Sequence, residues 1–257
     1  MDIAFSRHNG GDLGTIVLLH SLALDRTVWD GLIPHLTPHA DVVAVDLPNH
    51  GASPTLPEAS IEAMADALAA TVADQAPDGA IVMGLSLGGC VAQAFAVRHP
   101  QLVRGLALID TTCWYGESAP DDWAGRAQRA VDQGMASLAD FQLARWFSPG
   151  FAEERPDIGR HLLEVFQAND VAAYVATCHA MGAMDLRDRI GSIAVPTTII
   201  VGADDPATSP PHAERLRTLI PSASMHVVPD CSHLSAVEAP ATIGRLLDAA
   251  LLPRLRD

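Results

Sequence analysis

The sequence predicts an α/β fold in which a mostly parallel β-sheet is flanked by helices and interrupted by an all-helical cap insertion. Three observations lead to this prediction. Short apolar runs alternate with longer segments of helical periodicity, as in consecutive β/α units. Several of these runs are apolar throughout, which is typical of strands buried on both faces. The alternation stops between Cys113 and Ile193, where only helical patterns occur.

The strands and helices of the sheet region follow one another in chain order. Ile3–Phe5 is a candidate antiparallel edge strand. The parallel strands are expected over Ile16–Leu19, Val42–Val45, Ala80–Met83, Leu106–Ile109, Thr197–Val201 and Met225–Val228. Helices are expected between these strands, because apolar residues recur there at helical spacing. Proline lies near the start of several of these segments and directly after one of them. One helix begins at Ser60, and the others cover Leu87–His99, Pro211–Ile220 and Pro240–Leu252.

The interrupted region reads as four further helices. A helical segment inserted between two strands of a parallel sheet is expected to cover the carboxyl ends of the strands, where open α/β sheets bind ligands. We therefore predict a core domain over residues 1–112 and 193–257, with a helical cap over residues 113–192. The four cap helices are predicted at Asp121–Gln133, Ser137–Phe147, Pro156–Ala168 and Val171–Met184.

Composition excludes several classes of function. The chain has 257 residues and a formal net charge of −15, so we expect no nucleic-acid partner and no anionic membrane partner. No apolar stretch is long enough for a transmembrane helix and no signal peptide is apparent, which predicts a cytoplasmic protein. The four cysteines form no Cys-x-x-Cys pair, so we expect no metal site and no disulfide framework. Cys90 and Cys178 are expected in the core. The sequence leaves open whether the protein forms a homo-oligomer.

A glycine-flanked serine lies between a predicted strand and a predicted helix. The segment is Gly84-Leu85-Ser86-Leu87-Gly88. In this strand–turn–helix context the pattern predicts a nucleophile elbow, in which a sharp turn lifts the serine hydroxyl clear of the sheet. The other interpretation is a tight structural turn, because Gly-x-Ser-x-Gly also arises by chance. We take Ser86 as the candidate nucleophile.

A serine nucleophile needs a general base, and His233 is the candidate. It follows Asp230-Cys231-Ser232, after the last predicted strand and before the last helix, and is therefore expected at the same edge of the sheet as Ser86. Four other histidines fit less well. His226 is expected to be buried within a strand, and His99 lies at a helix end. His50 and His179 could touch a pocket.

The base needs an orienting carboxylate. Asp204 and Asp205 both follow the strand Thr197–Val201, and the chain order serine, aspartate, histidine is the order expected for this kind of fold. We choose Asp205, which precedes a short loop containing Thr208 and prolines, and leave Asp204 open as a turn or capping residue. Asp110, at the end of an earlier strand, is a rarer alternative acid or a cap.

Acyl transfer also needs hydrogen-bond donors for the oxyanion. One candidate is the backbone N–H of Leu87, directly after the nucleophile. The other is the N–H of Leu22, in the loop His20-Ser21-Leu22-Ala23 after the strand Ile16–Leu19. No metal or cofactor is needed for such chemistry.

These motifs resemble the α/β-hydrolase superfamily over nearly the full chain and, within it, the 3-oxoadipate enol-lactonases. Ser86, Asp205 and His233 match the family's triad, and Ser21-Leu22 is similar to its Ser-Leu-Gly segment. Two features depart from the family: the turn Leu47–Ser53 lacks Arg-Gly-His-Gly, and Ala23 replaces a common glycine. Family-like cap segments are Gly134-Met135, Leu138-Ala139-Asp140, Arg145-Trp146-Phe147 and Asp185-Leu186-Arg187.

The resemblance implies a serine hydrolase that cleaves a small ester or lactone through an acyl-enzyme, with 3-oxoadipate enol-lactone of aromatic catabolism as the substrate. A general carboxylesterase or thioesterase, a lyase and a ligand-binding protein are the alternatives. Because this lactone carries a carboxylate, an acidic protein would need a cation near the site. Arg126, Arg129 and Arg145 are candidates, if they are not solvated surface charges. Trp114, Trp146 and Met181 either line the pocket or pack the cap.

Overall fold

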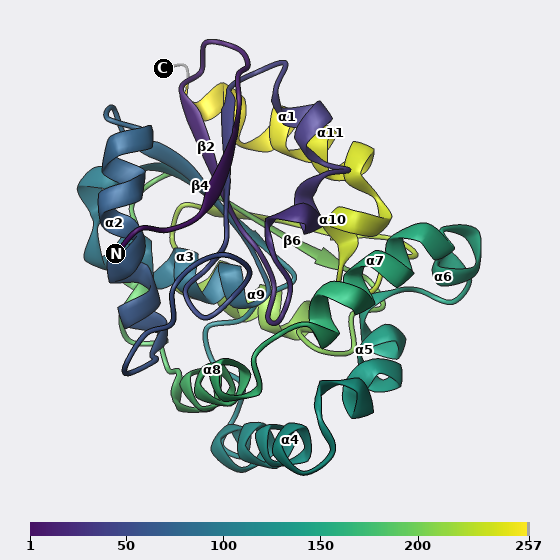
Figure 1. The fold of residues 1–257 in the computed structure, drawn as a ribbon. Coiled ribbons are helices and arrows are strands. Elements are labelled where there is room, and N and C mark those ends of the chain that lie inside the picture. Colours follow the sequence, from purple (N-terminus) through teal and green to yellow (C-terminus); the bar gives the residue numbers. More distant parts are fainter. Residues whose placement is uncertain (256–257) are drawn as a thin grey trace.

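The computed structural model describes residues 1–255, apart from the side chains of residues 152, 254 and 255. Within these residues seven strands form one sheet, in the order β1-β3-β2-β4-β5-β6-β7. Only the edge pair β1 and β3 is antiparallel (Figure 1). The predicted α/β fold is thereby confirmed. The strands are β1 (Phe5–His8), β2 (Thr15–Leu19), β3 (Asp41–Val45), β4 (Ala80–Leu85), β5 (Val103–Ile109), β6 (Thr197–Gly202) and β7 (Ala223–Val228).

Helices cover both faces of the sheet. α2 and α3 pack together on one face, and α1, α10 and α11 pack together on the other (Figure 1). Every residue of the central strands β2, β4 and β6 is therefore buried, which explains why their sequences are mostly apolar and do not alternate with polar residues. The helices are α1 (Ile33–Leu36), α2 (Ile61–Gln75), α3 (Leu87–Arg98), α9 (Pro210–Leu219), α10 (Ser235–Glu238) and α11 (Pro240–Ala250).

The edge strand β1 lies later in the chain than predicted. The prediction was Ile3–Phe5, whereas the strand runs over Phe5–His8 and pairs with residues 42–45 of β3. Its side chains alternate between exposed and half-buried, and three of its four residues are polar. A strand that contacts the core on one face only has no continuous apolar run, and for that reason the apolar-run criterion missed it.

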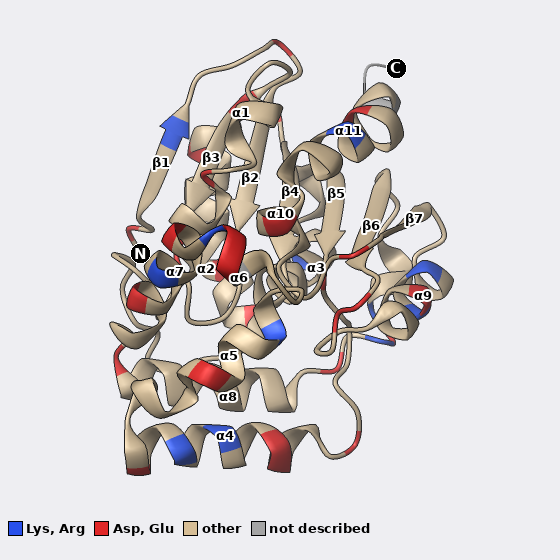
Figure 2. Ribbon diagram, turned by 90° about the vertical axis from the view of Figure 1, so that its right-hand side faces the viewer, with Lys and Arg blue, Asp and Glu red and all other residues tan. Residues whose placement is uncertain are grey.

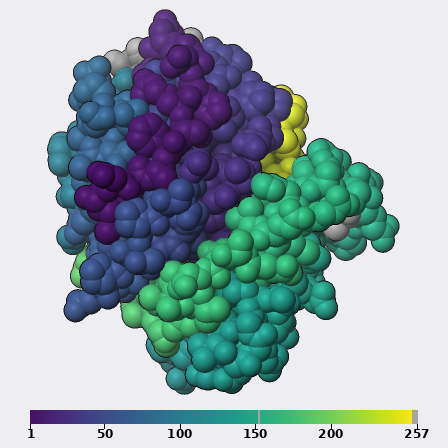
Figure 3. All heavy atoms as spheres, viewed as in Figure 1, coloured from purple at the N-terminus to yellow at the C-terminus, as the bar shows by residue number. Residues whose placement is uncertain are grey.

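The insert, residues 113–192, is helical as predicted. The four predicted helices correspond to α4, α5, α7 and α8, and the one-turn helix α6 was not predicted. α4 and α8 pack side by side beyond the strand ends (Figure 2), and the insert forms a lobe over that end (Figure 3). Its division from the core as a separate cap domain stays a prediction. The bounds are α4 (Ala119–Gln133), α5 (Ala139–Trp146), α6 (Phe151–Glu154), α7 (Pro156–Gln167) and α8 (Val171–Ala183).

Three further properties concern the whole described chain. None of its helices over residues 1–255 combines the length and apolarity that a membrane span requires. All four cysteines are buried and unpaired, including Cys90 in α3 and Cys178 in α8, as predicted for core residues. Among the described residues, no group of three or more histidine, cysteine or acidic side chains is placed to hold a metal ion.

Candidate active site

The turn between β4 and α3 places Ser86 in a strained conformation. Its backbone has φ 54° and ψ −113°, a conformation that residues other than glycine rarely adopt. The flanking glycines allow this turn. A Cβ atom on Gly84 would lie 2.2 Å from the carbonyl oxygen of Gly88, and one on Gly88 would lie 2.0 Å from that of Leu19. The local sequence thus makes a turn that holds the Ser86 hydroxyl above the sheet edge.

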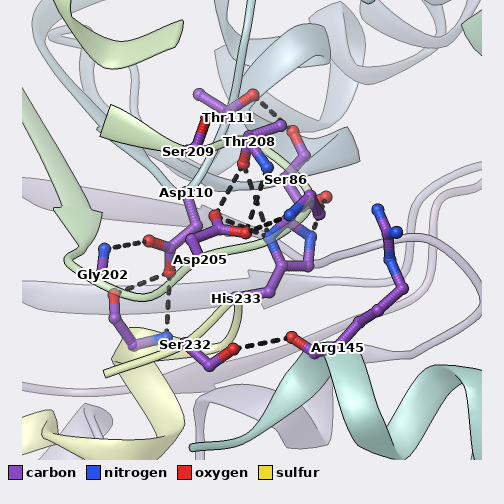
Figure 4. Close-up of polar contacts among 12 residues, drawn as sticks. Ser86, Asp110, Thr111, Arg145, Gly202, Asp205, Thr208, Ser209, Ser232 and His233 are labelled. Atoms are coloured by element: carbon purple, nitrogen blue, oxygen red, sulfur yellow. Dashed lines mark hydrogen bonds and ion pairs between the residues drawn. The ribbon is translucent and has the colours of Figure 1, made fainter. Parts of the chain in front are cut away.

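Ser86 lies beside His233 and Asp205, which come from loops far away in the sequence (Figure 4). The Ser86 Oγ is 2.9 Å from the His233 Nε2, and the His233 Nδ1 is 2.9 Å from the Asp205 Oδ2. All three residues are buried, with exposed fractions of 4%, 7% and 3%. The structure therefore brings together the nucleophile, base and acid candidates that the sequence singled out.

Asp205, and not Asp204, faces His233. Asp204 is exposed. The Asp205 Oδ1 accepts hydrogen bonds from the amides of Ala207 (2.7 Å) and Thr208 (3.0 Å), while Oδ2 accepts from the Thr208 hydroxyl (2.9 Å) and faces His233. Burial alone would raise the pKa of Asp205, but the charge of His233 and these hydrogen bonds outweigh it and lower the pKa to about 2. Asp205 is therefore a charged acceptor at neutral pH.

Asp110 is a second buried carboxyl group close to these residues, but it is not hydrogen-bonded to His233 within the described chain. Its Oδ1 accepts from the amide of Gly202 (2.8 Å), and its Oδ2 accepts from the amide (2.9 Å) and hydroxyl (2.7 Å) of Ser235. Burial, reinforced by the negative charge of Asp205, raises the pKa of Asp110 to about 7. Asp110 thus joins the ends of the two loops that carry Asp205 and His233.

The loop after β2 is braced by a neutral histidine. The His20 Nδ1–H donates to the carbonyl of Ser21 (2.7 Å), and the His20 Nε2 accepts from the amide of Leu47 (2.9 Å). Burial lowers the pKa of His20 to about 4, so the ring is neutral at pH 7. Ala23 has φ 57°, in the left-handed region that favours glycine, and so it adopts this conformation at a cost of about 1 kcal/mol.

The neighbouring turn Asp46–Ser53 is a structural brace. The buried Asp46 accepts hydrogen bonds from the amides of Arg26 (3.0 Å) and Ala52 (2.9 Å), and it also pairs with the Arg26 guanidinium. Gly51 has φ 52°, and a Cβ there would lie 2.4 Å from the Asp46 carboxylate. The turn therefore needs glycine at this position whatever the surrounding sequence.

The competing histidines lie elsewhere. His99 pairs with Asp66, and His50 packs against His20 with ring centroids 5.0 Å apart. His179 is exposed on α8. His226 is in β7 as predicted, but it is half-buried instead of buried, because β7 is an edge strand.

A small cavity of about 30 Å³ lies over Ser86 and His233 and adjoins a cleft of about 450 Å³. The cleft is bordered by α4 and α5. The two spaces share Tyr115, Trp123, Arg126, Arg145 and Ala207. Leu22, Trp146 and Met181 line the small cavity as well. Trp114 lines neither of these two spaces, and the guanidinium of Arg187 stacks on its ring at 3.8 Å.

Two of the three candidate cations reach the cavity over Ser86. Arg126 and Arg145 line both spaces, whereas Arg129 lines only the cleft and donates to the carbonyl of Ser137 (2.6 Å). Within the described residues neither Arg126 nor Arg145 forms an ion pair with a carboxylate. Arg126 donates to the Tyr174 hydroxyl (2.6 Å), and burial together with the nearby Arg126 lowers the pKa of Arg145. The cavity is therefore lined by two guanidinium groups that form no ion pair with a described carboxylate.

Sequence reasoning assigned no role to three residues at this site. Thr208 holds Asp205, and Glu238 binds the loop of His233. Gln142 on α5 is 3% exposed and lines the small cavity, but its side-chain amide forms no hydrogen bond with a described residue. Thr208 could have been found as a hydroxyl three residues after the acid, a common local capping spacing. Nothing in the local sequence marks Glu238 or Gln142.

Comparisons with known proteins agree with this arrangement. Residues 16–245 match the alpha/beta hydrolase family. The chain is 28% identical over 242 residues to 3-oxoadipate enol-lactonase 2 of Acinetobacter baylyi, covering 93% of this chain and 89% of that protein. It is 31% identical over 223 residues to a pimeloyl-[acyl-carrier protein] methyl ester esterase of Chromobacterium violaceum, with coverage of 85% and 86%.

The solved structures include a close match in fold. The crystal structure of the enol-lactonase from Burkholderia xenovorans superimposes with a TM-score of 0.89 at 30% identity, covering 99% of this chain and 96% of that one. The family match covers most of the sheet and the whole insert, and the relatives comprise both lactone and ester hydrolases. The chain therefore belongs to the alpha/beta hydrolase family, and it is similar in fold and sequence to enol-lactonases and esterases.

Proposed function

We propose that this protein is a serine hydrolase that cleaves a carboxylic ester or lactone through an acyl-enzyme. The observation that carries the proposal is the chain of two 2.9 Å contacts from the Ser86 Oγ through His233 to Asp205. A hydroxyl becomes a useful nucleophile when an adjacent base takes its proton and a third group orients that base. The two contacts support these roles for Ser86, His233 and Asp205.

The proposed reaction has two halves. Ser86 attacks the carbonyl carbon while the His233 Nε2 accepts the hydroxyl proton, and the imidazolium then protonates the leaving oxygen. In a lactone that oxygen stays tethered to the acyl group. Water, deprotonated by His233, then attacks the acyl-enzyme, releases the acid and restores Ser86. Asp205 keeps the proton of neutral His233 on Nδ1, so that Nε2 is free to accept.

The oxyanion of each tetrahedral intermediate would be held by the amides of Leu22 and Leu87. Leu87 is the first residue of α3, so its N–H has no intrahelical acceptor and stands at the positive end of the helix. Leu22 lines the same small cavity as Ser86. Backbone donors depend on the fold more than on side-chain identity, which is why the replacement of glycine by Ala23 leaves this role available.

For the substrate we propose 3-oxoadipate enol-lactone, and the cavity's charge supports it. This lactone carries a carboxylate, and the guanidinium groups of Arg126 and Arg145 reach the cavity without a carboxylate partner among the described residues. In a chain of net charge −15, such local positive charge would counter the repulsion of an anionic substrate. The small cavity of about 30 Å³ would take the reacting carbonyl group, and the rest of the ring and the carboxylate would extend towards the cleft of about 450 Å³.

Hydrolysis assays test both levels of the proposal. The enol-lactone and short neutral p-nitrophenyl esters are given to the wild type, to Ser86→Ala and to Arg145→Met. We expect lactone turnover that disappears in Ser86→Ala, and a KM raised about tenfold in Arg145→Met for the lactone alone, because one charge-assisted contact is lost. Ester turnover without lactone turnover would keep the serine mechanism and replace the substrate by a general ester or thioester. Turnover that survives in Ser86→Ala would contradict the role of Ser86. No hydrolysis at all would contradict the mechanism and favour a lyase or a binding protein.

A further inference from the structure

The loop that carries His233 is bound to the carboxyl-terminal end of α5 in the insert. The amide of His233 donates to the carbonyl of Arg145 (3.3 Å), and the amide of Leu234 donates to that of Trp146 (2.9 Å). The Ser232 hydroxyl also donates to the Arg145 carbonyl (2.9 Å), as Figure 4 shows. The last carbonyl groups of a helix lack intrahelical donors, so the loop and the helix end satisfy each other's backbone groups.

Glu238, at the end of α10, holds both partners at once. Its Oε1 accepts from the amide of Ser232 (2.6 Å), directly before His233. Its Oε2 accepts from the amide of Ser148 (2.7 Å), just after α5, and also from the Ser148 hydroxyl. Glu238 is half-buried, so these bonds to a carboxylate are only partly exposed to competing water.

We propose that Glu238 is a positioning residue for His233, acting through the bridge between Ser232 and Ser148. The inference rests on the proposed hydrolase function, in which the His233 Nε2 must stay 2.9 Å from the Ser86 Oγ. The same helix end carries Arg145, and Gln142 lies one turn before it, both lining the cavity. The bridge therefore fixes the position of His233, which moves the proton, relative to Arg145 and Gln142, which line the cavity.

A carboxylate is required for this bridge because each of its oxygens faces N–H donors. Glutamine has the same shape but only one acceptor oxygen, so in Glu238→Gln one arm of the bridge places an NH₂ group against a backbone N–H. Since a displacement of about 1 Å at a catalytic group can cost on the order of 100-fold in rate, we expect kcat to fall roughly ten- to 100-fold. KM should change less than about twofold, because the side chain does not contact substrate.

The test compares Glu238→Gln with Glu214→Gln, which removes an exposed carboxylate on α9 that pairs with Arg217. Steady-state kinetics are measured with a short p-nitrophenyl ester, and amide hydrogen exchange is measured over residues 230–238. We expect lower kcat and faster exchange of the Ser232–Leu234 amides in Glu238→Gln, with neither change in Glu214→Gln. Thermal unfolding confirms that both variants are folded.

Each outcome bears on a different claim. Unchanged exchange in Glu238→Gln would overturn the inference, because the bridge would not hold the loop. Faster exchange with an unchanged kcat would also overturn it, since Glu238 would then be structural and not positioning. If the wild type hydrolyses neither esters nor lactones, the proposed function fails, while exchange in the two variants still decides whether Glu238 holds the loop of His233.

Discussion

Replacing Asp205 by asparagine should disable His233 without removing it. The Asp205 Oδ1 accepts from two backbone amides, those of Ala207 and Thr208, so the single side-chain oxygen of the introduced asparagine is expected to take this position. The NH₂ group of the asparagine then points at the His233 Nδ1, where Asp205 has its Oδ2. An N–H donor facing Nδ1 forces the ring's own proton onto Nε2, and an Nε2–H cannot accept the proton of Ser86.

The expected cost follows from the loss of the base. Reversing the histidine tautomer while keeping the geometry should lower kcat by about 10³- to 10⁴-fold. At about 1.36 kcal/mol per tenfold change, this is a loss of roughly 4–5 kcal/mol of transition-state stabilisation. Initial rates of p-nitrophenyl ester hydrolysis measure it, with KM expected to stay within about twofold because the substitution lies behind His233 and away from the substrate.

The neighbouring aspartate provides a matched control. Asp204→Asn makes the same chemical change one residue earlier, on an exposed side chain that has no contact with His233 in the structure. It should keep wild-type kcat. A loss of less than about tenfold in Asp205→Asn, or an equal loss in both variants, would refute the tautomer argument.

Three further outcomes are expected. Gly88→Ala should cost about 3 kcal/mol or more of unfolding free energy, seen in urea unfolding, because the new Cβ would lie 2.0 Å from the carbonyl oxygen of Leu19; unchanged stability would contradict the strained turn. Asp110 has its pKa raised from 3.8 to about 7, so its own contribution to the unfolding free energy should fall as pH rises from about 4 to 7, opposite in sign to the contribution of His20, whose pKa is lowered to about 4. Asp110→Asn removes the falling contribution, so the unfolding free energy of the variant should change more positively with pH over this range than that of the wild type; equal slopes would contradict this. Gln142→Leu should raise KM for the lactone several-fold without lowering Tm, because no internal hydrogen bond is lost; a lower Tm with unchanged KM would show a structural role.

The elements with strong local signals were predictable from the sequence. The continuous apolar runs identified β2, β4 and β6, because strands covered on both faces have no polar side to show. The strained turn at Ser86 was predictable for a similar reason: the glycines at positions 84 and 88 are required by backbone atoms within the same short segment or on the adjacent strand. The choice of Asp205 over Asp204 also agrees with the contacts to His233.

Features that depend on distant segments were not predictable. Glu238 lies 90 residues from Ser148 in the chain, and Asp110 lies 125 residues from Ser235, so no local pattern reveals either contact. From the sequence alone, Arg145 fits a solvated surface charge equally well, and only the fold shows that it lines the cavity over Ser86. The bounds predicted for the edge strand β1 were shifted, because a strand that contacts the core on one face only carries polar residues. Sequence reasoning therefore identified the candidate reacting groups but not the residues that hold them.

The central claim is that Ser86 carries the acyl group, and intact-protein mass spectrometry during turnover of a slow p-nitrophenyl ester tests it most directly. We expect a transient mass increase equal to one acyl group, located at Ser86 by peptide mapping, together with a burst of p-nitrophenol of one equivalent per active site. Neither should occur in Ser86→Ala. Acylation at another residue, or hydrolysis that continues unchanged in Ser86→Ala, would contradict the account.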